Sequence, residues 1–409
     1  MTSHPTTTHR PPTGERPAAR TGPPLLPADT PVQLLDDLGH RVAPAAEVEE
    51  RGYRAPEPEL LVEAWRRMVV GRRFDVQATA LTKQGRLAVY PSSRGQEACQ
   101  VGAILALQQR DWFFPTYRDS VALITRDIDP VEVLTLLRGD AHCGYDPMAT
   151  RTAAQCTPLA TQLIHAAGVA HGETRKGRGS VALAFTGDGA TSEGDFHEAL
   201  NFAAVFRSPT IFFVQNNKYA ISVPFSKQSK APSLAHKGVG YGVPAEQVDG
   251  NDPMAVLAVM QRAVEHARGG GGPFLVEAHT YRLDAHTNAD DATRYRESDE
   301  VTQWLTRDPI VRLENHLRAE GLIDDAQVDA VKHEAEEYAA RLRDRMNVDS
   351  QLDPLSIFDH VYERPTPQVA EQRAQVEAEL AAEREFAEEQ DDQDDQDDQD
   401  DQDHEESGR

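Results

Sequence analysis

Short, mostly apolar runs alternate with segments of helical periodicity in the middle of the chain. The runs cover residues 181–185, 211–214 and 274–278, and each has glycine or proline close by. Between the first two runs, Phe196, Leu200 and Ala203 recur at the spacing of one helix face. Runs of this length are typical of strands buried on both faces. The alternation predicts an α/β fold, in which helices cover both faces of a parallel sheet.

Four further segments have helical patterns. From Pro58, apolar residues recur at three- and four-residue intervals, which places them on one face of a helix. Helices are also predicted over 96–108 and 131–137, and residues 324–346 have the pattern of a charged amphipathic helix.

Composition divides the chain into three parts. Residues 1–55 are rich in proline, threonine and alanine and predict a disordered arm, in which the apolar stretch 32–38 is a candidate contact segment. Residues 56–364 are predicted to form the α/β domain. Residues 365–409 are predicted to be helical at first and then a disordered acidic tail, because the Gln-Asp-Asp repeats from Gln390 add like charges and no apolar surface.

The charge distribution argues against nucleic-acid binding. The chain has 42 Lys and Arg against 67 Asp and Glu, a formal net charge of −25, and the segment from Glu371 onward carries −15 of it. The rest is only mildly acidic, whereas phosphate backbones are bound by clustered Lys and Arg. No apolar run approaches the roughly 20 residues that span a bilayer. Three cysteines without a paired spacing favour a reducing compartment, so we expect a cytoplasmic protein.

Residues that can carry chemistry follow two of the predicted strands. Gly187-Asp188-Gly189 comes after the first, and Asn216-Asn217 after the second. Neighbouring parallel strands bring their carboxyl ends to the edge where open α/β sheets bind ligands. Carboxylate, amide and carbonyl oxygens suit Mg²⁺, which completes its shell with phosphate oxygens and water. Gly-Asp-Gly alone is typical of a plain turn between a strand and a helix. Together with the asparagine pair it predicts a site for a metal-bridged diphosphate.

In its full context this region resembles a known family. The stretch from Gly187 to Asn217 resembles the thiamine-diphosphate motif, and its surroundings resemble the α subunit of the decarboxylating E1 component of 2-oxo acid dehydrogenase complexes. The similarity extends from about residue 58 to residue 363. It rests on six separated motifs in the order typical of the family, at 84–86, 117–118, 158–162, 187–222, 248–252 and 286–291.

The resemblance implies a thiamine-diphosphate-binding fold and a residue set for the cofactor and its metal. Asp188, the side chain of Asn217 and the backbone carbonyl of Tyr219 would bind Mg²⁺. The implied contacts to thiamine diphosphate are Tyr117, Arg118, Thr157, Leu159, Asp188, Gly189, Ala190, Asn217 and His286. Among these, Gly189 and Ala190 would offer backbone amides to the diphosphate, and Arg118 would pair with a diphosphate oxygen.

His286 is the implied catalytic residue. It would reach both the diphosphate and the reaction centre, as a proton donor or a polarising group. An unperturbed pKa of about 6.5 allows histidine to serve as either acid or base near neutral pH.

The resemblance also implies the activity and the partners. The chain would be the α subunit of an oxidoreductase that decarboxylates a small-molecule 2-oxo acid and passes the acyl group to a lipoylated E2 acyltransferase. The family places the carboxylate that activates the cofactor on a separate E1 β subunit, so we expect an α₂β₂ heterotetramer. A branched-chain 2-oxo acid is favoured by the motifs at 158–162 and 249–252, and by the small Val89 and Thr116 if they line the acyl pocket.

Several alternatives remain at this point. Pyruvate or acetoin could be the substrate instead, because one methylene is worth only ~1–3 kcal/mol of discrimination. The chain could also be a non-catalytic α-like partner subunit, although intact Asp188, Asn217 and His286 argue against this. A single-chain thiamine enzyme would need both halves of the site, for which this chain is too short.

Overall fold

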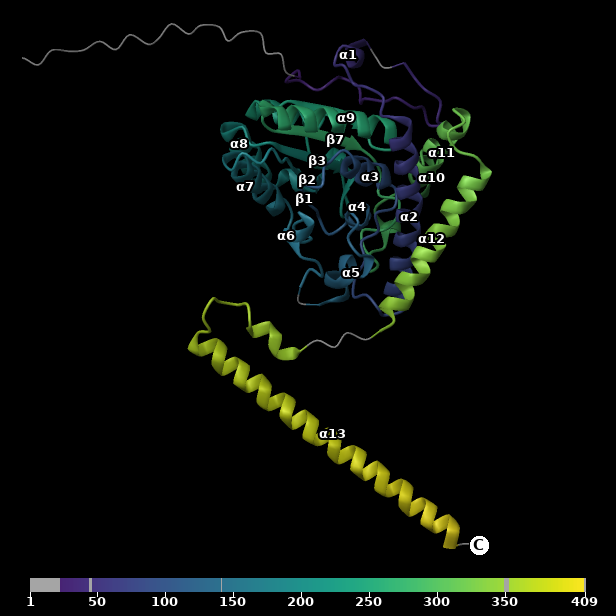
Figure 1. Ribbon diagram of the computed structural model, residues 1–409, viewed down its shortest axis with the longest axis vertical. Helices are drawn as coiled ribbons and strands as arrows, with labels where there is room; N and C mark the ends of the chain where they lie inside the picture. The colour runs from purple at the N-terminus through teal and green to yellow at the C-terminus, as the bar shows by residue number, and fades with distance from the viewer. Residues whose placement is uncertain (1–22, 44–45, 141, 349–352, 408–409) are drawn as a thin grey trace, which may run out of the picture. The chain divides into compact units, whose positions relative to one another are not determined.

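Five strands form a parallel sheet in the computed structural model (Figure 1). In spatial order they are β1 (Trp112–Phe114), β2 (Ala182–Gly187), β3 (Thr210–Asn216), β7 (Phe274–His279) and β6 (Ala245–Asp249). Strands β2, β3 and β7 confirm the three runs identified in the sequence. The helices on both faces of the sheet confirm the α/β class.

The structure describes residues 23–43, 46–140, 142–348 and 353–407. It divides into two units, Met1–Asn347 and Val348–Arg409, and the first contains the sheet. The division falls earlier than the boundary after residue 364 that the sequence suggested.

Helices of the first unit begin at signals that are visible in the sequence. Helix α2 has proline at its first position, where the missing N–H is not needed. Helix α12 begins with a capping box between Asp324 and Gln327, and it packs along α2. The helices are α1 (Ala46–Glu49), α2 (Pro58–Lys83), α3 (Glu97–Leu105), α4 (Ser120–Thr125), α5 (Pro130–Arg138), α6 (Pro147–Thr150), α7 (Thr161–Arg175), α8 (Gly194–Phe206), α9 (Pro253–His266), α10 (Ser298–Leu305), α11 (Pro309–Ala319) and α12 (Asp325–Met346). Helices α2, α3, α5, α8 and α12 confirm the predicted ones.

Side chains leave the sheet alternately toward its two faces, as the pleat requires. Phe185 and Phe213 belong to the core that β2 and β3 share with α2, α3 and α9. Ala184 and Phe212 belong to the opposite core, under α7 and α8. Burial of one phenylalanine side chain contributes roughly 1.5–3 kcal/mol, so the two cores hold the ends of β2 and β3 firmly in place.

Residues 23–43 pack within the first unit, although the sequence predicted a disordered arm through residue 55. Val32 is fully buried and forms a parallel bridge with Val248 of β6. The Asp252 carboxylate accepts hydrogen bonds from the backbone N–H groups of Leu34 and Leu35, each at 2.7 Å. The apolar stretch 32–38 therefore contacts its own chain, because it finds both apolar cover and backbone partners there. The parts of the predicted arm at 1–22 and 44–45 lie outside the described residues.

The second unit contains helix α13 (Pro367–Ser407), preceded by the short 3₁₀ turn Pro354–Phe358. The sequence predicted that helical structure gives way to a disordered tail near Gln390, whereas the structure continues as helix to Ser407. The residues before Gln390 are mostly alanine, glutamate, glutamine and arginine, which favour helix. Extending an existing helix avoids the cost of nucleation. None of the described helices is long and apolar enough to cross a lipid bilayer.

Candidate active site

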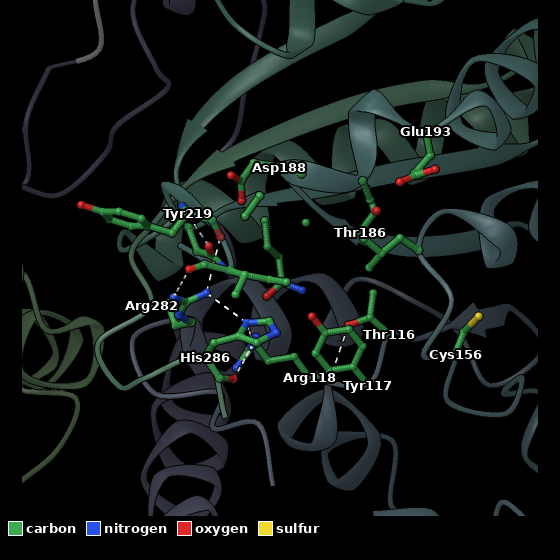
Figure 2. A pocket seen from close by; sticks show the side chains of 18 of the residues that line it. Thr116, Tyr117, Arg118, Cys156, Thr186, Asp188, Glu193, Tyr219, Arg282 and His286 are labelled. Carbon is green, nitrogen blue, oxygen red and sulfur yellow. Dashed lines mark hydrogen bonds between the residues drawn. The ribbon is translucent and has the colours of Figure 1, made fainter. Parts of the chain in front are cut away.

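A cavity opens at the carboxyl ends of β2 and β3 (Figure 2). Gly187 of β2 pairs with Gln215 of β3, so Asp188 and Asn217, which follow the two strands, are brought to the same cavity. This juxtaposition was expected from the sequence. The predicted site residues that line the cavity are Tyr117, Arg118, Leu159, Asp188, Gly189, Ala190, Asn217, Tyr219 and His286.

Asp188 is a buried carboxylate, only 2% exposed. Its Oδ2 accepts a hydrogen bond of 2.6 Å from Nε2 of Gln228, which also donates to the carbonyl of Val223. Burial raises the pKa of Asp188, while the Gln228 hydrogen bond and the charges of Lys218 and Arg282 lower it. A cation bound directly to this carboxylate would offset the cost of burial.

Asn217 and Tyr219 supply neutral oxygens to the same cavity. The Nδ2 of Asn217 donates to Oε1 of Gln96 at 3.0 Å, which leaves its Oδ1 turned away from Gln96. Tyr219 lies in the hairpin of β4 (Tyr219–Ala220) and β5 (Val223–Pro224), and its carbonyl has a long contact of 3.5 Å to Arg282. Among the described residues, no three His, Cys, Asp or Glu side chains gather as a metal cluster. One carboxylate with neutral oxygens is a donor set that fits Mg²⁺.

Cationic groups lie across the cavity from Asp188 (Figure 2). Arg118 donates to the carbonyl of Ser92 at 2.9 Å and to the carbonyl of His286 at 2.9 Å. Arg282 donates to the carbonyl of Ile221 at 2.8 Å. Both guanidinium groups approach Nδ1 of His286, at 3.1 Å from Arg118 and 3.2 Å from Arg282.

This environment fixes the state of His286. Burial, followed by the charges of Arg118 and Arg282, lowers the pKa of His286 to about 4. The imidazole is therefore neutral near pH 7. Guanidinium groups can only donate hydrogen bonds, so Nδ1 of His286 accepts and its proton is on Nε2.

The two arginines leave room for an anion. Nε of Arg282 is buried and has no hydrogen-bond partner among the described residues. Burial and the nearby charge of Arg118 lower the pKa of Arg282, so a polyanion in the cavity would relieve the repulsion between the two. Gly189 and Ala190 begin the 3₁₀ turn Gly189–Ser192, where the first N–H groups have no partner within the turn. These groups together fit a diphosphate.

Two residues proposed from the sequence are not part of the cavity lining. Thr157 is exposed and lies outside it, because the loop directs its neighbours Cys156, Pro158 and Leu159 to the cavity instead. Val89 is also absent from the lining, whereas Thr116 is present. The expectation that Val89 shapes an acyl pocket is not supported by this arrangement.

The structure adds residues that the sequence analysis did not identify, namely Gln96, Glu193, Gln228 and Arg282. Arg282 had a signal, since it lies four residues before His286 just after an apolar strand. Gln96 and Gln228 had none, because each comes from a segment far from the strand ends.

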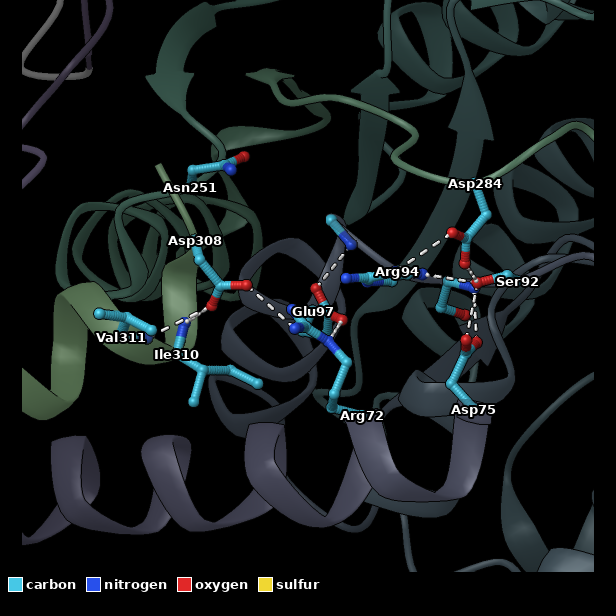
Figure 3. A network of polar contacts seen from close by, with 12 residues as sticks. Arg72, Asp75, Ser92, Arg94, Glu97, Asn251, Asp284, Asp308, Ile310 and Val311 are labelled. Atoms are coloured by element: carbon cyan, nitrogen blue, oxygen red, sulfur yellow. Dashed lines mark hydrogen bonds and ion pairs between the residues drawn. The ribbon is translucent and has the colours of Figure 1, made fainter. Parts of the chain in front are cut away.

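A partly buried polar network supports the loop behind Arg118 (Figure 3). The hydroxyl of Ser92 lies 2.6 Å from Oδ2 of Asp75 and 2.7 Å from Oδ2 of Asp284. Glu97 accepts from the backbone N–H of Gly95 at 2.8 Å and pairs with Arg72 of α2. Since the Ser92 carbonyl accepts a hydrogen bond from Arg118, this network helps to set the position of that guanidinium group.

Comparisons with known proteins agree with this geometry. Residues 65–351 match the family model described as dehydrogenase E1 component. The chain is 46% identical over 351 residues to the 3-methyl-2-oxobutanoate dehydrogenase subunit alpha of Mycobacterium tuberculosis. This alignment covers 86% of this chain and 94% of the relative. It is 39% identical over 343 residues to the pyruvate dehydrogenase E1 component subunit alpha of Staphylococcus epidermidis, which covers 83% of this chain and 91% of the relative.

The extent of these matches decides the family. The family model spans most of the first unit, and the relatives are covered over more than nine tenths of their length. Members of this family depend on thiamine diphosphate, which agrees with the donor set of the cavity. The chain belongs to the dehydrogenase E1 component family, as an α subunit of the 2-oxo acid dehydrogenase type.

Proposed function

We propose that this α subunit binds thiamine diphosphate through Mg²⁺ in the cavity at the ends of β2 and β3, and that it takes part in the oxidative decarboxylation of a 2-oxo acid. One observation carries the proposal. Asp188 lies on one side of the cavity, with Arg118 and His286 across from it, and Asn217 lines the same cavity. Such a site can hold a divalent cation and a diphosphate together.

Each group has a role in holding the cofactor. Asp188, Asn217 Oδ1 and the Tyr219 carbonyl are the proposed Mg²⁺ ligands. Arg118 and Arg282 neutralise the diphosphate, and the backbone amides of Gly189 and Ala190 add hydrogen bonds to it. When bound, thiamine diphosphate supplies the nucleophilic carbon and the electron sink that decarboxylation of a 2-oxo acid requires.

His286 acts on the substrate side. Because its imidazole is neutral with the proton on Nε2, it can donate a hydrogen bond to negative charge that develops on the substrate oxygen. If it gave up that proton as a general acid, the ring would become an imidazolate, whose negative charge the guanidinium groups of Arg118 and Arg282 at Nδ1 would stabilise. Its two arginine neighbours disfavour an imidazolium and thereby keep the residue in this form.

The active site is proposed to be completed by a β subunit in an α₂β₂ heterotetramer. Of the described residues that line the cavity, only Asp188 and Glu193 are carboxylates, and Glu193 is exposed. With Asp188 engaged by the metal, we infer that the carboxylate that activates the cofactor comes from the β subunit. Leu159 and Ile221 at the cavity are 45% and 56% exposed, and this apolar surface would be covered by such a partner.

A branched-chain 2-oxo acid is the proposed substrate. The relative at 46% identity is named for 3-methyl-2-oxobutanoate, against 39% for one named for pyruvate. Thr116 lines the cavity and is small enough to leave room for a branched side chain. Pyruvate is the second candidate, since differences of one or two carbons in an apolar pocket amount to only ~1–3 kcal/mol each. Acetoin remains a further candidate.

The acyl group is proposed to pass to a lipoylated E2 acyltransferase. The proposed location is the cytoplasm, which suits the three free cysteines Cys99, Cys143 and Cys156.

Co-expression with the β subunit tests the proposal. The purified complex should decarboxylate 3-methyl-2-oxobutanoate faster than pyruvate, with kcat/KM as the measure. The Asp188→Ala variant should lose Mg²⁺-dependent retention of thiamine diphosphate. Normal retention in that variant would remove Asp188 from the metal site, and a preference for pyruvate would reassign the substrate.

The same experiment separates the catalytic proposal from a non-catalytic α-like subunit. A non-catalytic subunit would assemble with the β subunit and yet leave both 2-oxo acids unchanged. Turnover that depends on His286 excludes this alternative.

A further inference from the structure

Four buried side chains form a continuous hydrogen-bonded series between the loop at Thr116 and the metal side of the cavity. Gln215 Nε2 donates to Oδ1 of Asp119 at 2.7 Å, and Gln96 Nε2 donates to Oε1 of Gln215 at 2.7 Å. Asn217 Nδ2 then donates to Oε1 of Gln96 at 3.0 Å. All four side chains are at most 7% exposed. We call this series the amide relay.

The direction of the amide relay is fixed where it begins. Oδ2 of Asp119 accepts from the backbone N–H of Thr116 at 2.6 Å and from the Thr116 hydroxyl at 2.7 Å. A backbone N–H can only donate and a carboxylate can only accept. Gln215 must therefore present Nε2 to Asp119 and Oε1 to Gln96.

A second backbone group sets the same direction. The N–H of Ala122 donates to Oε1 of Gln100 at 3.1 Å, so Nε2 of Gln100 points the other way. It donates to the Arg118 carbonyl at 3.2 Å and toward Oε1 of Gln215 at 3.5 Å. Two independent anchors thus place the Gln215 oxygen on the side of Gln96.

We propose that Asp119, Gln215 and Gln96 are positioning residues that orient the amide of Asn217, so that its Oδ1 faces the cavity as a metal ligand. The inference rests on the proposed function, in which Asn217 binds Mg²⁺. An amide turned the other way would offer its NH₂ group to the cation, and this group has no lone pair available for coordination. Residues that support a metal ligand in this way commonly contribute 10–100-fold in metal affinity.

One local contact acts in the same sense but is weaker. The backbone N–H of Tyr219 lies 3.4 Å from Oδ1 of Asn217, at the long limit for a hydrogen bond. The shorter contacts of the amide relay therefore dominate the orientation.

The Asp119→Asn variant reverses the amide relay. An asparagine at 119 has to give its oxygen to the Thr116 N–H, which turns its NH₂ toward Gln215. The contact from Gln100 to Gln215, at 3.5 Å, is too long to hold Gln215 against this change. Gln215 and Gln96 therefore rotate in turn, and Asn217 presents Nδ2 to the cavity. We expect the Mg²⁺ dissociation constant, measured by titration calorimetry at saturating thiamine diphosphate in the complex with the β subunit, to rise about 10–100-fold.

A second substitution should restore the affinity. In the Asp119→Asn/Gln96→Glu double variant, a carboxylate at 96 accepts from both Gln215 and Asn217. The Asn217 oxygen then faces the cavity again, and the net charge equals that of the wild type. Recovery to within about threefold of the wild-type Mg²⁺ affinity would support the proposal, because a second buried substitution has no reason to improve Mg²⁺ affinity unless it restores the direction of the hydrogen bonds.

Controls separate this inference from the proposed function. Gln77→Glu makes the same amide-to-carboxylate change at a buried position of α2 outside the cavity, and it should leave Mg²⁺ affinity unchanged. Absence of Mg²⁺-dependent binding in the wild type would refute the proposed function itself. Unchanged affinity in Asp119→Asn, or a double variant that is no better than the single one, would overturn the amide relay alone.

Folding does not obscure the outcome. If Asp119→Asn does not fold on its own, as judged by circular dichroism, the double variant decides. A folded double variant with near wild-type affinity supports the inference, and one that fails to fold or to bind Mg²⁺ overturns it.

Discussion

Gly189 lies so close to Ala220 that a Cβ atom on residue 189 would stand 2.6 Å from the Cβ of Ala220. Non-bonded carbon atoms do not tolerate this distance, so the Gly189→Ala variant must displace the β4–β5 hairpin. We expect weaker Mg²⁺-dependent binding of thiamine diphosphate, because Tyr219 belongs to that hairpin. Titration of the cofactor into the complex with the β subunit measures the change.

The control for this prediction is Gly194→Ala at the start of α8. A Cβ atom there would meet nothing within 4 Å, so cofactor binding should be unaffected. Equal binding by both variants would show that the contact with Ala220 does not position the hairpin.

The His286→Gln variant should separate catalysis from cofactor binding. Glutamine can keep a hydrogen bond to the arginines but cannot transfer a proton. Removal of a general acid typically costs about 10²–10⁴-fold in rate, so we expect kcat for acyl transfer to fall within that range while the cofactor dissociation constant changes less than about tenfold. A loss of binding as large as the loss of kcat would contradict a catalytic role.

The same variant should change how stability depends on pH. The pKa of His286 is lowered from 6.5 to about 4 in the folded chain. Between these values the unfolded chain binds a proton that the folded chain does not, so stability falls as pH decreases from about 6.5 to about 4. Urea unfolding across this window should show a shallower loss for His286→Gln than for the wild type. Parallel curves would mean that burial and the arginines do not perturb this histidine.

Replacement of Arg312 of α11 should lower the free energy of unfolding strongly, although Arg312 is not part of the cavity. Its side chain is fully buried, donates to Asp249 at 2.9 Å and to the Leu35 carbonyl, and lies near Asp252. Burial raises the pKa of Asp252 to about 6, and Arg312 is the main charge that lowers it. Arg312→Met leaves that carboxylate without its cation, and we expect a loss of roughly 3–5 kcal/mol in the free energy of unfolding.

Arg318 on the same helix provides the comparison. It forms ion pairs with Glu314 and Asp325 at the surface, where water and salt screen the interaction. Arg318→Met should leave the urea midpoint nearly unchanged. Similar losses in the two variants would indicate that charge number, and not burial, determines the effect.

The sequence was sufficient for the elements whose signal is local. The three apolar strands, and the residues that follow two of them, could be predicted because burial on both faces leaves a continuous apolar run. Strand β6 could not, since its Glu246 and Gln247 are polar and yet buried. Glu246 receives hydrogen bonds from the backbone of Ala28 and the hydroxyl of Tyr53, partners that no local pattern reveals.

The residues of the site also divide into those that could be predicted from the sequence and those that could not. Asp188, Asn217 and His286 lie in recognisable motifs, whereas only the fold brings Gln96 to the cavity and Gln228 to Asp188. Gln228 contacts Asp188 from 40 positions away. The exposed position of Thr157 was equally hidden, because a motif fixes which loop approaches the cofactor and not which side chains of that loop face it.

The bridge between Val32 and Val248 has a consequence for assembly. Strand β6 is an outer strand of the sheet, and outer strands offer free N–H and C=O groups to strands of other molecules. Val32 forms hydrogen bonds with two of these groups. Its N–H donates to the Gln247 carbonyl at 2.8 Å, and its carbonyl accepts from the Asp249 N–H at 3.0 Å. Removal of the segment before residue 43 would expose the edge of β6. We expect the shortened chain to aggregate at concentrations where the intact chain does not, and light scattering measures the difference.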